Sequence, residues 1–463
     1  METLDKIFTW LNGYLWGPPM LILLFGTHLF FTFRLRGIQR YTRLAIKLSV
    51  TKDQEAVGDV SQFGALATAL AATVGTGNIV GVATAVALGG PGAVLWCWLT
   101  GVFGIATKYS EALLAVKYRV KTSDGTMLGG PMYALERGLK MRWLAIVFAI
   151  FAAIAAFGIG NTVQANSIST MADTTFHINP WITGIVMTIL VAVVILGGIK
   201  SIARFCEALV PFMAVSYILG CLIILGTGYT TIPATIALIG KTAFTGQAAF
   251  GGFIGAAFMT AARYGIARGL FSNESGLGSA PIVAAAARTR NPVRQALVSS
   301  TGTFWDTVVI CAMTGLVLVN TGVWQTGLKG AELTKAAFDH VPVVGPIVLA
   351  VGLFTFVFST IIGWSYYGER AVEYLLGKQA IFPYRLLWVA AVLVGSVATL
   401  PVVWNFADAA NAMMAIPNLI SLLLLNGIIV AETKKYLWTD NLDEFAPADD
   451  MQAPPASNTE DSR

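Results

Sequence analysis

The sequence predicts an all-α integral membrane protein with about eleven transmembrane helices. Hydrophobic residues make up 56% of its 463 residues and charged residues only 12%, which excludes an ordinary soluble domain. Apolar runs of membrane-spanning length recur along the whole chain. One of them contains the polar stretch Thr-Val-Gly-Thr-Gly-Asn at residues 73–78. Such a stretch suits a helix that stops, unwinds and restarts inside the membrane, because lipid offers no partners to free backbone groups.

The apolar runs give the spans in chain order. We expect helices near residues 15–33, 64–88, 92–116, 143–170, 181–198, 207–226, 248–267, 296–319, 344–367, 384–402 and 407–431. If the N-terminus lies outside, 24 lysines and arginines fall in cytoplasmic segments and 4 in outer segments. The positive-inside rule therefore predicts a multi-pass protein of the plasma (inner) membrane with its C-terminus in the cytoplasm.

The spans predict an internal repeat. Residues 1–60 form an extra transmembrane helix and a basic segment, either an amphipathic helix on the cytoplasmic face or an ordinary loop. Two five-helix units follow at 61–228 and 244–432, and 433–463 form a disordered acidic tail. Because five is odd, the two units cross the membrane in opposite senses. Helix 2 (64–88) and the glycine-interrupted helix 7 (Gly246, Gly251, Gly252 and Gly255) open the units, which indicates an inverted repeat with a binding site between discontinuous helices.

The break in helix 2 offers both kinds of backbone dipole. The N–H groups of the half-helix that restarts near Thr76 and Gly77 favour an anion such as a carboxylate. The carbonyls of Ala71, Thr73 and Val74 at the end of the preceding half favour a cation, and Asn78 adds a neutral oxygen. The alternative is a tightly packed kink in which Gly77 and Gly81 form the contact face.

Helix 9 can complete a cation site. Ser359 and Thr360 are adjacent hydroxyls, and the carbonyl of Phe356 lies one turn earlier on the same face. Together with the helix 2 carbonyls these oxygens could surround sodium, although Ser and Thr often bond to their own helix instead. Trp364 lies one further turn along, where it could close a substrate cavity.

Other polar residues within the predicted spans are also candidates for a binding site inside the membrane. Gln164 in helix 4 is a deep candidate for substrate contact, and Asp306 in helix 8 either tunes cation affinity or pairs with a basic residue. Glu111 lies near a predicted helix end, which favours a surface role. Residues 268–279 lack the Gly-Lys-Ser/Thr ending of a nucleotide loop, so we expect an ordered cytoplasmic gate there. The three histidines form no zinc spacing and no catalytic set, which argues against an enzyme and against a bound cofactor.

Several motifs together resemble the alanine/glycine:cation symporter family, a group of sodium:alanine/glycine symporters in the amino acid-polyamine-organocation superfamily. They are Gly75-Thr76-Gly77-Asn78 with the glycines that follow to residue 92, Ala106-Thr107-Lys108, Gly269-Leu270-Phe271-Ser272-Asn273-Glu274 and Gly363-Trp364-Ser365-Tyr366-Tyr367. The resemblance spans about residues 15–430. It implies eleven helices, a leucine-transporter-type 5+5 inverted repeat and sodium-driven uptake of alanine or glycine.

The resemblance also implies site residues. Asn78, Gln164, Thr360 and Trp364 fall where family members contact substrate, and Ala71, Val74, Ser359 and Thr360 fall where this fold commonly holds sodium. We expect Phe356 to add a sodium ligand, and Thr76, Gly77, Gly252 and Phe253 to complete the substrate site. The expected partners are a small neutral amino acid, Na⁺ and the lipid bilayer, with no nucleotide or nucleic acid.

The preferred function is symport by alternating access, and three alternatives stay open. A larger neutral amino acid such as glutamine could be the substrate, with sodium or protons as the coupling ion. A passive channel would need a continuous polar face along several helices, and only helix 4 supplies one. A transporter-like sensor would need a folded signalling domain, which the short tail does not provide.

Overall fold

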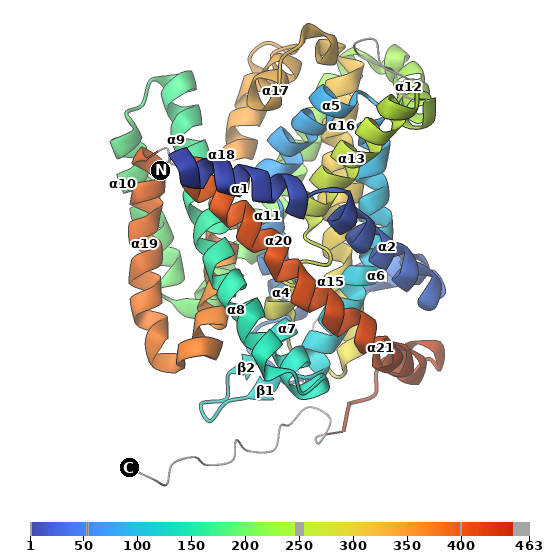
Figure 1. Cartoon of the computed structure of the whole chain (residues 1–463), viewed down its shortest axis with the longest axis vertical. Coiled ribbons are helices and arrows are strands. Elements are labelled where there is room, and N and C mark those ends of the chain that lie inside the picture. The colour runs from blue at the N-terminus through green and yellow to red at the C-terminus, as the bar shows by residue number, and fades with distance from the viewer. Residues whose placement is uncertain (1, 52, 54, 246–253, 399–400, 448–463) are drawn as a thin grey trace.

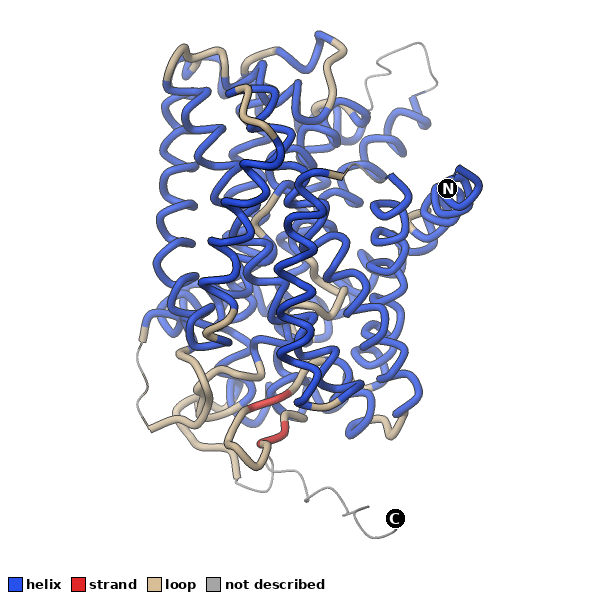
Figure 2. Tube along the Cα trace, turned by 90° about the vertical axis from the view of Figure 1, so that its left-hand side faces the viewer, coloured by secondary structure: helices blue, strands red, loops and turns tan. Residues whose placement is uncertain are grey.

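Long helices running roughly along one axis dominate the computed structural model of the chain, which describes residues 2–51, 53, 55–245, 254–398 and 401–447 (Figures 1 and 2). The first half contains α1 (Glu2–Leu15), α2 (Pro18–Arg34), α3 (Thr42–Val50), α4 (Gln62–Thr73), α5 (Val82–Gly89), α6 (Ala93–Lys117), α7 (Pro131–Tyr133), α8 (Arg142–Phe157), α9 (Val163–Phe176), α10 (Pro180–Ile195) and α11 (Gly198–Thr227). The two short strands β1 (Val120–Lys121) and β2 (Met127–Leu128) pair antiparallel between α6 and α7.

The second half begins after α11. It contains α12 (Ile232–Thr245), α13 (Ile254–Asn273), α14 (Pro281–Ala284), α15 (Pro292–Thr303), α16 (Ala312–Asn320), α17 (Gly330–Phe338), α18 (Val344–Leu376), α19 (Ile381–Val397), α20 (Pro401–Leu424) and α21 (Asn426–Thr433). Among the described residues, four π-helical segments lie between α-helices: η2 (Gly77–Gly81), η3 (Ala134–Gly138), η4 (Gly158–Thr162) and η6 (Phe304–Cys311). A fifth, η9 (Lys434–Trp438), follows α21.

Seven helical stretches among the described residues are long and apolar enough to cross a membrane, so the chain is a multi-pass membrane protein. Two further helices, Gln62–Thr73 and Gly77–Gly89, pass the same test only together, with a bend of 53° between them. Each of the eleven predicted spans overlaps a helix, although α10 has only 16 residues. The count of eleven spans therefore stays a prediction.

The predicted interruption of helix 2 lies between α4 and η2. α4 begins at Ser61, whose Oγ accepts a hydrogen bond from the Gly64 N–H at 2.8 Å. The helix ends at Thr73, and Val74 has an extended backbone (φ −77°, ψ 97°). The side chain of Asn78 then stabilises the restart, because its Oδ1 accepts the Gly75 N–H at 2.9 Å.

A second interruption follows α13, beyond the predicted span at 248–267. Residues 274–280 leave the helix, with positive φ at Glu274 (54°), Gly276 (93°) and Gly278 (87°). The prediction of a cytoplasmic gate at 268–279 is wrong, because 269–273 belong to α13 and Ser272 to Ser275 are buried. The glycines at 246, 251 and 252 lie outside the described residues.

Glu111 of α6 holds this second interruption in place. Its Oε1 accepts the N–H of Gly276 at 2.9 Å, the N–H of Gly278 at 3.1 Å and Nδ2 of Asn418 from α20 at 2.7 Å. The predicted surface role of Glu111 is therefore wrong, since only 2% of the residue is exposed. A buried carboxylate is stabilised here by three donors that the unwound backbone and α20 supply.

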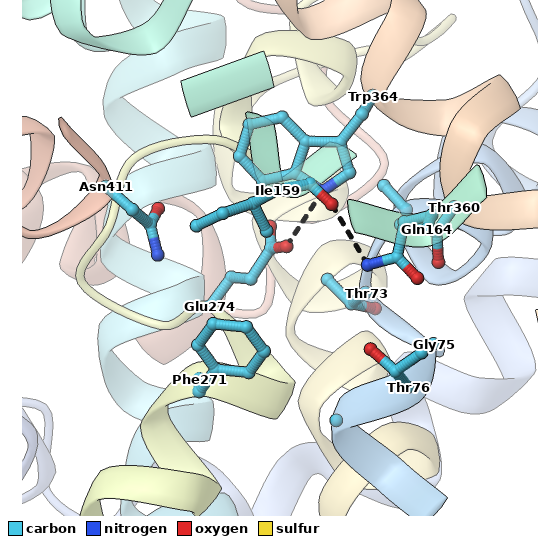
Figure 3. Close-up of a pocket in the computed structure, with 12 residues that line it drawn as sticks. Thr73, Gly75, Thr76, Ile159, Gln164, Phe271, Glu274, Thr360, Trp364 and Asn411 are labelled. Atoms are coloured by element: carbon cyan, nitrogen blue, oxygen red, sulfur yellow. Dashed lines mark hydrogen bonds between the residues drawn. The ribbon is translucent and has the colours of Figure 1, made fainter. Parts of the chain in front are cut away.

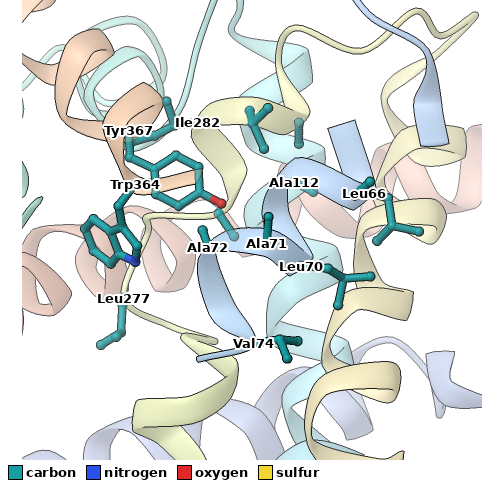
Figure 4. Packing of buried hydrophobic residues seen from close by; sticks show 14 of the residues in the cluster. Leu66, Leu70, Ala71, Ala72, Val74, Ala112, Leu277, Ile282, Trp364 and Tyr367 are labelled. Atoms are coloured by element: carbon teal, nitrogen blue, oxygen red, sulfur yellow. The ribbon is translucent and has the colours of Figure 1, made fainter. Parts of the chain in front are cut away.

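The broken α4 packs against the long helix α18 in the middle of the molecule. Figure 4 shows Ala71 and Ala72 of α4 beside Trp364 and Tyr367 of α18. The contact is close because Gly363 has no side chain: a Cβ there would lie 2.7 Å from both Cβ and N of Ala72. This approach brings the end of α4 to the polar turn of α18 that contains Ser359 and Thr360.

Different secondary-structure elements form the two ends of the molecule. The β1–β2 pair lies at the same end as α21 and the chain's C-terminal part, whereas α12 and α17 lie at the opposite end (Figures 1 and 2). Helix α1 lies across α20, to which it is tied by a hydrogen bond of 2.7 Å from Asn12 Nδ2 to the carbonyl of Asn405. The middle of the bundle, where α4 and α13 break, is enclosed by the long helices.

Candidate binding site at the broken helices

Five oxygen atoms from two helices meet where α4 ends. The Ser359 hydroxyl lies 3.1 Å from the carbonyl of Ala71 and 2.8 Å from the carbonyl of Phe356. The Thr360 hydroxyl lies 3.4 Å from the carbonyl of Val74 and 2.9 Å from that of Phe356. A hydroxyl that donates one hydrogen bond keeps lone pairs for a cation. These are the five residues that the sequence predicted for sodium, and the structure brings them together.

The neutral character of this cluster is suited to an alkali cation. Carbonyl and hydroxyl oxygens are hard ligands of the kind that hard cations prefer. Among the described residues no group of three or more His, Cys, Asp or Glu side chains is placed to hold a metal. Ser359 and Thr360 are both buried, so the oxygens face one another away from lipid.

A small cavity lies beside the cation cluster. It is lined by Ala72, Thr73, Gly75, Thr76, Gly77, Ile159, Gln164, Phe271, Glu274, Thr360, Trp364 and Asn411, and Figure 3 shows their side chains converging on it. Thr360 belongs to both places, because its hydroxyl touches the Val74 carbonyl while the residue lines the cavity. The cation cluster and the cavity therefore share a wall.

Hydrogen-bond donors and acceptors occupy different parts of the cavity wall. Thr76 and Gly77 lie at the start of η2, where the first N–H groups of a helix lack partners within that helix. Gln164 supplies an acceptor: its Nε2 donates to the carbonyl of Ile159 at 3.0 Å, and its Oε1 is buried without a hydrogen-bond partner among the described residues. Oδ1 of Asn411, from α20, is also buried without a hydrogen-bond partner among the described residues.

Glu274 adds a carboxyl group to the acceptors. Its Oε1 accepts a hydrogen bond from Nε1 of Trp364 at 3.1 Å (Figure 3). Its Oε2 accepts one from Ser279 at 2.5 Å. The first of these bonds joins the break after α13 to α18. A zwitterion fits such a wall, since its carboxylate can face the N–H groups while its ammonium faces the acceptors.

The structure places the predicted substrate residues in three groups. Thr76, Gly77, Gln164, Thr360 and Trp364 line the cavity. Asn78 does not: its Nδ2 donates to Asp306 Oδ1 at 2.7 Å and its Oδ1 accepts the Gly75 N–H, so both polar atoms face away from the cavity. Gly252 and Phe253 lie outside the described residues.

Seven lining residues were not predicted as substrate contacts: Ala72, Thr73, Gly75, Ile159, Phe271, Glu274 and Asn411. Phe271 and Glu274 belong to a motif that contributed to the family resemblance, and this was the available signal. The sequence offered no signal for Asn411, because a single amide side chain in a span such as 407–431 is common in a helix that packs against other helices.

Comparisons with known proteins identify the family of this chain. The model of the sodium:alanine symporter family matches residues 1–447. The chain is 52% identical over 436 residues to the sodium/alanine symporter AgcS of Methanococcus maripaludis, covering 92% of this chain and 95% of that protein. It is 37% identical to the probable sodium/glutamine symporter GlnT of Bacillus subtilis, covering 94% and 91%.

A solved structure shows the same kind of fold. A single-residue mutant of the manganese transporter of Eremococcus coleocola superposes with a TM-score of 0.51 at 12% identity, covering 83% of this chain and 81% of that one. At this identity the likeness concerns the fold alone. The resemblance predicted from the motifs and the absence of enzymatic function are confirmed by the family match and the relatives. This chain belongs to the sodium:alanine symporter family.

Proposed function

We propose that the protein is a sodium-coupled symporter that takes up a small neutral amino acid, alanine or glycine, by alternating access. The observation that carries the proposal is the shared wall: Thr360 contributes its hydroxyl to the cation cluster and also lines the cavity. The break between α4 and η2 supplies carbonyls to the cation cluster and N–H groups to the cavity. One short stretch of unwound backbone thus contacts both ligands.

Sodium occupies the five oxygens of Ala71, Val74, Phe356, Ser359 and Thr360 in this proposal. The amino acid places its carboxylate on the N–H groups of Thr76 and Gly77 and its ammonium towards Oε1 of Gln164 and the carboxylate of Glu274. Phe271, Ile159 and Trp364 leave room only for a short side chain. Asn78 acts indirectly, because it holds Gly75 and thereby the backbone on which the carboxylate docks.

Two five-helix units at 61–228 and 244–432 rock against each other to expose the site alternately. The two interruptions, after α4 and after α13, support an inverted 5+5 repeat, since each falls near the start of its unit. Basic residues are frequent in the segments around β1–β2, for example Lys117, Arg119 and Lys121, and in η9 with Lys434 and Lys435, which supports a cytoplasmic position for that end and an outer position for the N-terminus.

The driving force is adequate. One sodium ion moving inward across 100 mV releases about 2.3 kcal/mol. A tenfold concentration gradient adds about 1.4 kcal/mol. Together they support several-hundredfold accumulation of a neutral substrate at about 1.4 kcal/mol per factor of ten.

Uptake of radiolabelled alanine into proteoliposomes tests the proposal. An inward sodium gradient should drive accumulation and an equal potassium gradient should not. Ser359→Ala should raise the sodium concentration for half-maximal uptake, because it removes one of the five oxygens. Ser365→Ala is the matched control: its hydroxyl is also buried in α18 and bonds only to the Ile362 carbonyl of its own helix.

The same assay separates the alternatives. Accumulation of glutamine in preference to alanine would move the substrate to a larger amino acid, for which the relative GlnT is the precedent. Uptake that follows a proton gradient without sodium would refute sodium coupling. Uptake that never saturates and shows no counterflow would refute a carrier mechanism.

A further inference from the structure

Asn411 of α20 has a buried side-chain amide whose oxygen accepts no hydrogen bond. Only 2% of the residue is exposed, and its Oδ1 has no donor among the described residues. The side chain lines the cavity beside the cation cluster. Because a buried acceptor without a donor destabilises a fold, a ligand that supplies the missing donor gives this amide a reason to be there.

The same helix contains a second buried asparagine, and that one holds the fold together. Asn418 lies seven residues after Asn411, about two helical turns, so both side chains fall on one face of α20. Nδ2 of Asn418 donates to Oε1 of Glu111 at 2.7 Å and to the carbonyl of Gly276 at 2.9 Å. The amide of Asn411 is directed to the cavity instead (Figure 3). The two amides therefore have different tasks, one in the fold and one at the cavity.

Asn411 lies across the cavity from the backbone on which the substrate carboxylate docks. Figure 3 shows Thr76 on one side of the cavity and Asn411 on the other, with Phe271 between them. In the proposed pose the carboxylate of the amino acid binds at Thr76 and its ammonium faces Gln164. The side chain of the amino acid then points towards Asn411.

We propose that Asn411 determines specificity by binding the side-chain hydroxyl of serine, so that serine is a substrate beside alanine and glycine. A hydroxyl supplies the donor that Oδ1 of Asn411 lacks. Ile159, Phe271 and Trp364 limit the length of the side chain, and serine exceeds alanine by a single oxygen atom. The inference rests on the proposed function and deepens it, because it adds a hydroxyl-bearing amino acid to the class of substrates.

An apolar side chain of the same length should bind less well than serine. In α-aminobutyrate a methyl group replaces the serine hydroxyl, so it covers the oxygen of Asn411 and cannot donate to it. Discrimination by one unpaired acceptor predicts that serine binds about 5- to 150-fold more tightly than α-aminobutyrate. Alanine is shorter by one atom and leaves this position to a water molecule, which can pair with the amide.

Competition against alanine uptake tests the inference. Proteoliposomes take up radiolabelled alanine under an inward sodium gradient while serine or α-aminobutyrate is added at rising concentrations. In the wild type the half-inhibitory concentration of serine should lie about 5- to 150-fold below that of α-aminobutyrate. Radiolabelled serine should itself accumulate with sodium, which distinguishes a substrate from a blocker.

Two variants locate the effect. Asn411→Leu keeps nearly the same side-chain volume without an acceptor, and it should bring the two half-inhibitory concentrations together. Asn426→Leu is the matched control. The Nδ2 of Asn426 donates to the carbonyl of Leu423, away from the cavity, so this variant should keep the wild-type ratio.

Each outcome decides the inference. Equal inhibition by serine and α-aminobutyrate in the wild type, serine that inhibits without accumulating, or stronger inhibition by glutamine than by serine would overturn it. A ratio that Asn411→Leu leaves unchanged would also overturn it, including the case in which serine and alanine lose affinity equally, because Asn411 would then bind a group that all substrates share. If Asn411→Leu does not transport, the wild-type ratio still decides, and Asn411→Ala supplies a second variant. Absence of sodium-driven alanine uptake by the wild type would refute the proposed function instead.

Discussion

Replacing Gly363 by alanine should weaken sodium binding without touching a sodium ligand. A Cβ at Gly363 would lie 2.7 Å from both Cβ and the backbone N of Ala72. A backbone atom cannot rotate away, so α18 must move from α4. Ser359 and Thr360 lie one turn before Gly363, and Ala71 adjoins Ala72, so this movement separates the hydroxyls from the carbonyls of Ala71 and Val74.

The magnitude follows from the cost of overpacking. Forcing a methyl group into a filled contact costs about 1–3 kcal/mol. If sodium binding must bring the helices back together, that cost appears as a rise of about 5- to 150-fold in the half-maximal sodium concentration. The assay is alanine uptake against sodium concentration, with thermal unfolding in detergent as the measure of folding.

Gly226→Ala is the matched control. Gly226 also lies inside a long helix, α11, but a Cβ there would meet nothing within 4 Å. Alanine favours a helix over glycine by about 1 kcal/mol, so this variant should unfold at the same or a higher temperature and keep the wild-type sodium dependence. An unchanged sodium dependence in Gly363→Ala would refute the argument that close packing of α4 on α18 holds the cation oxygens together.

Three further predictions concern other parts of the molecule. Gln164→Leu should raise the KM for alanine about 5- to 150-fold, because it removes the free Oε1 at a cost of about 1–3 kcal/mol, and an unchanged KM in uptake kinetics would contradict the proposed pose. Trp364→Phe removes the donor to Glu274 Oε1 and should raise the KM by up to about tenfold while Trp388→Phe, on α19 and outside the cavity, should not. The hydrogen bond from Arg290 lowers the pKa of Asp53, so this carboxylate stabilises the fold above its ordinary pKa and loses that contribution as the pH falls through its lowered value. Asp53→Asn should therefore lower the Tm at neutral pH, with the difference from wild type disappearing in acid, and a difference that persists there would exclude the ion pair as its cause.

The sequence predicted the first helix break, but it gave no signal for the buried break after α13. Residues 73–78 combine glycine, threonine and asparagine inside an apolar run, and lipid penalises such a run unless the backbone is interrupted. The second break depends on Glu111, which lies 165 residues before Gly276 in the chain and gives no local signal. Glycine content alone pointed to residues 246–255, whereas the break that the structure describes is fixed by a tertiary contact.

Some residues of the candidate site could likewise be predicted from the local sequence, and others could not. Spacing on one helix sufficed to choose Phe356, Ser359 and Thr360, since their positions follow from helical geometry. Asn78 adjoins the cavity in sequence, yet its amide is directed to Gly75 and Asp306, and no property of the sequence reveals which way an amide turns. Glu274 and Asn411 reach the cavity only because α13 and α20 converge on it in three dimensions.

The chemistry of the cluster near Ser359 favours sodium over a proton as the ion that binds there. A proton carrier must offer a group that titrates in the working range, and the five atoms of the cluster are carbonyl and hydroxyl oxygens that do not. Three carboxyl side chains among the described residues adjoin the breaks, Asp306, Glu111 and Glu274, and each is engaged by hydrogen-bond donors. These donors are Asn78 for Asp306, the backbone N–H of Gly276 for Glu111, and Trp364 for Glu274. In the proposed mechanism each ligand orders backbone that the other uses, so coupling arises from the shared break and needs no separate proton relay.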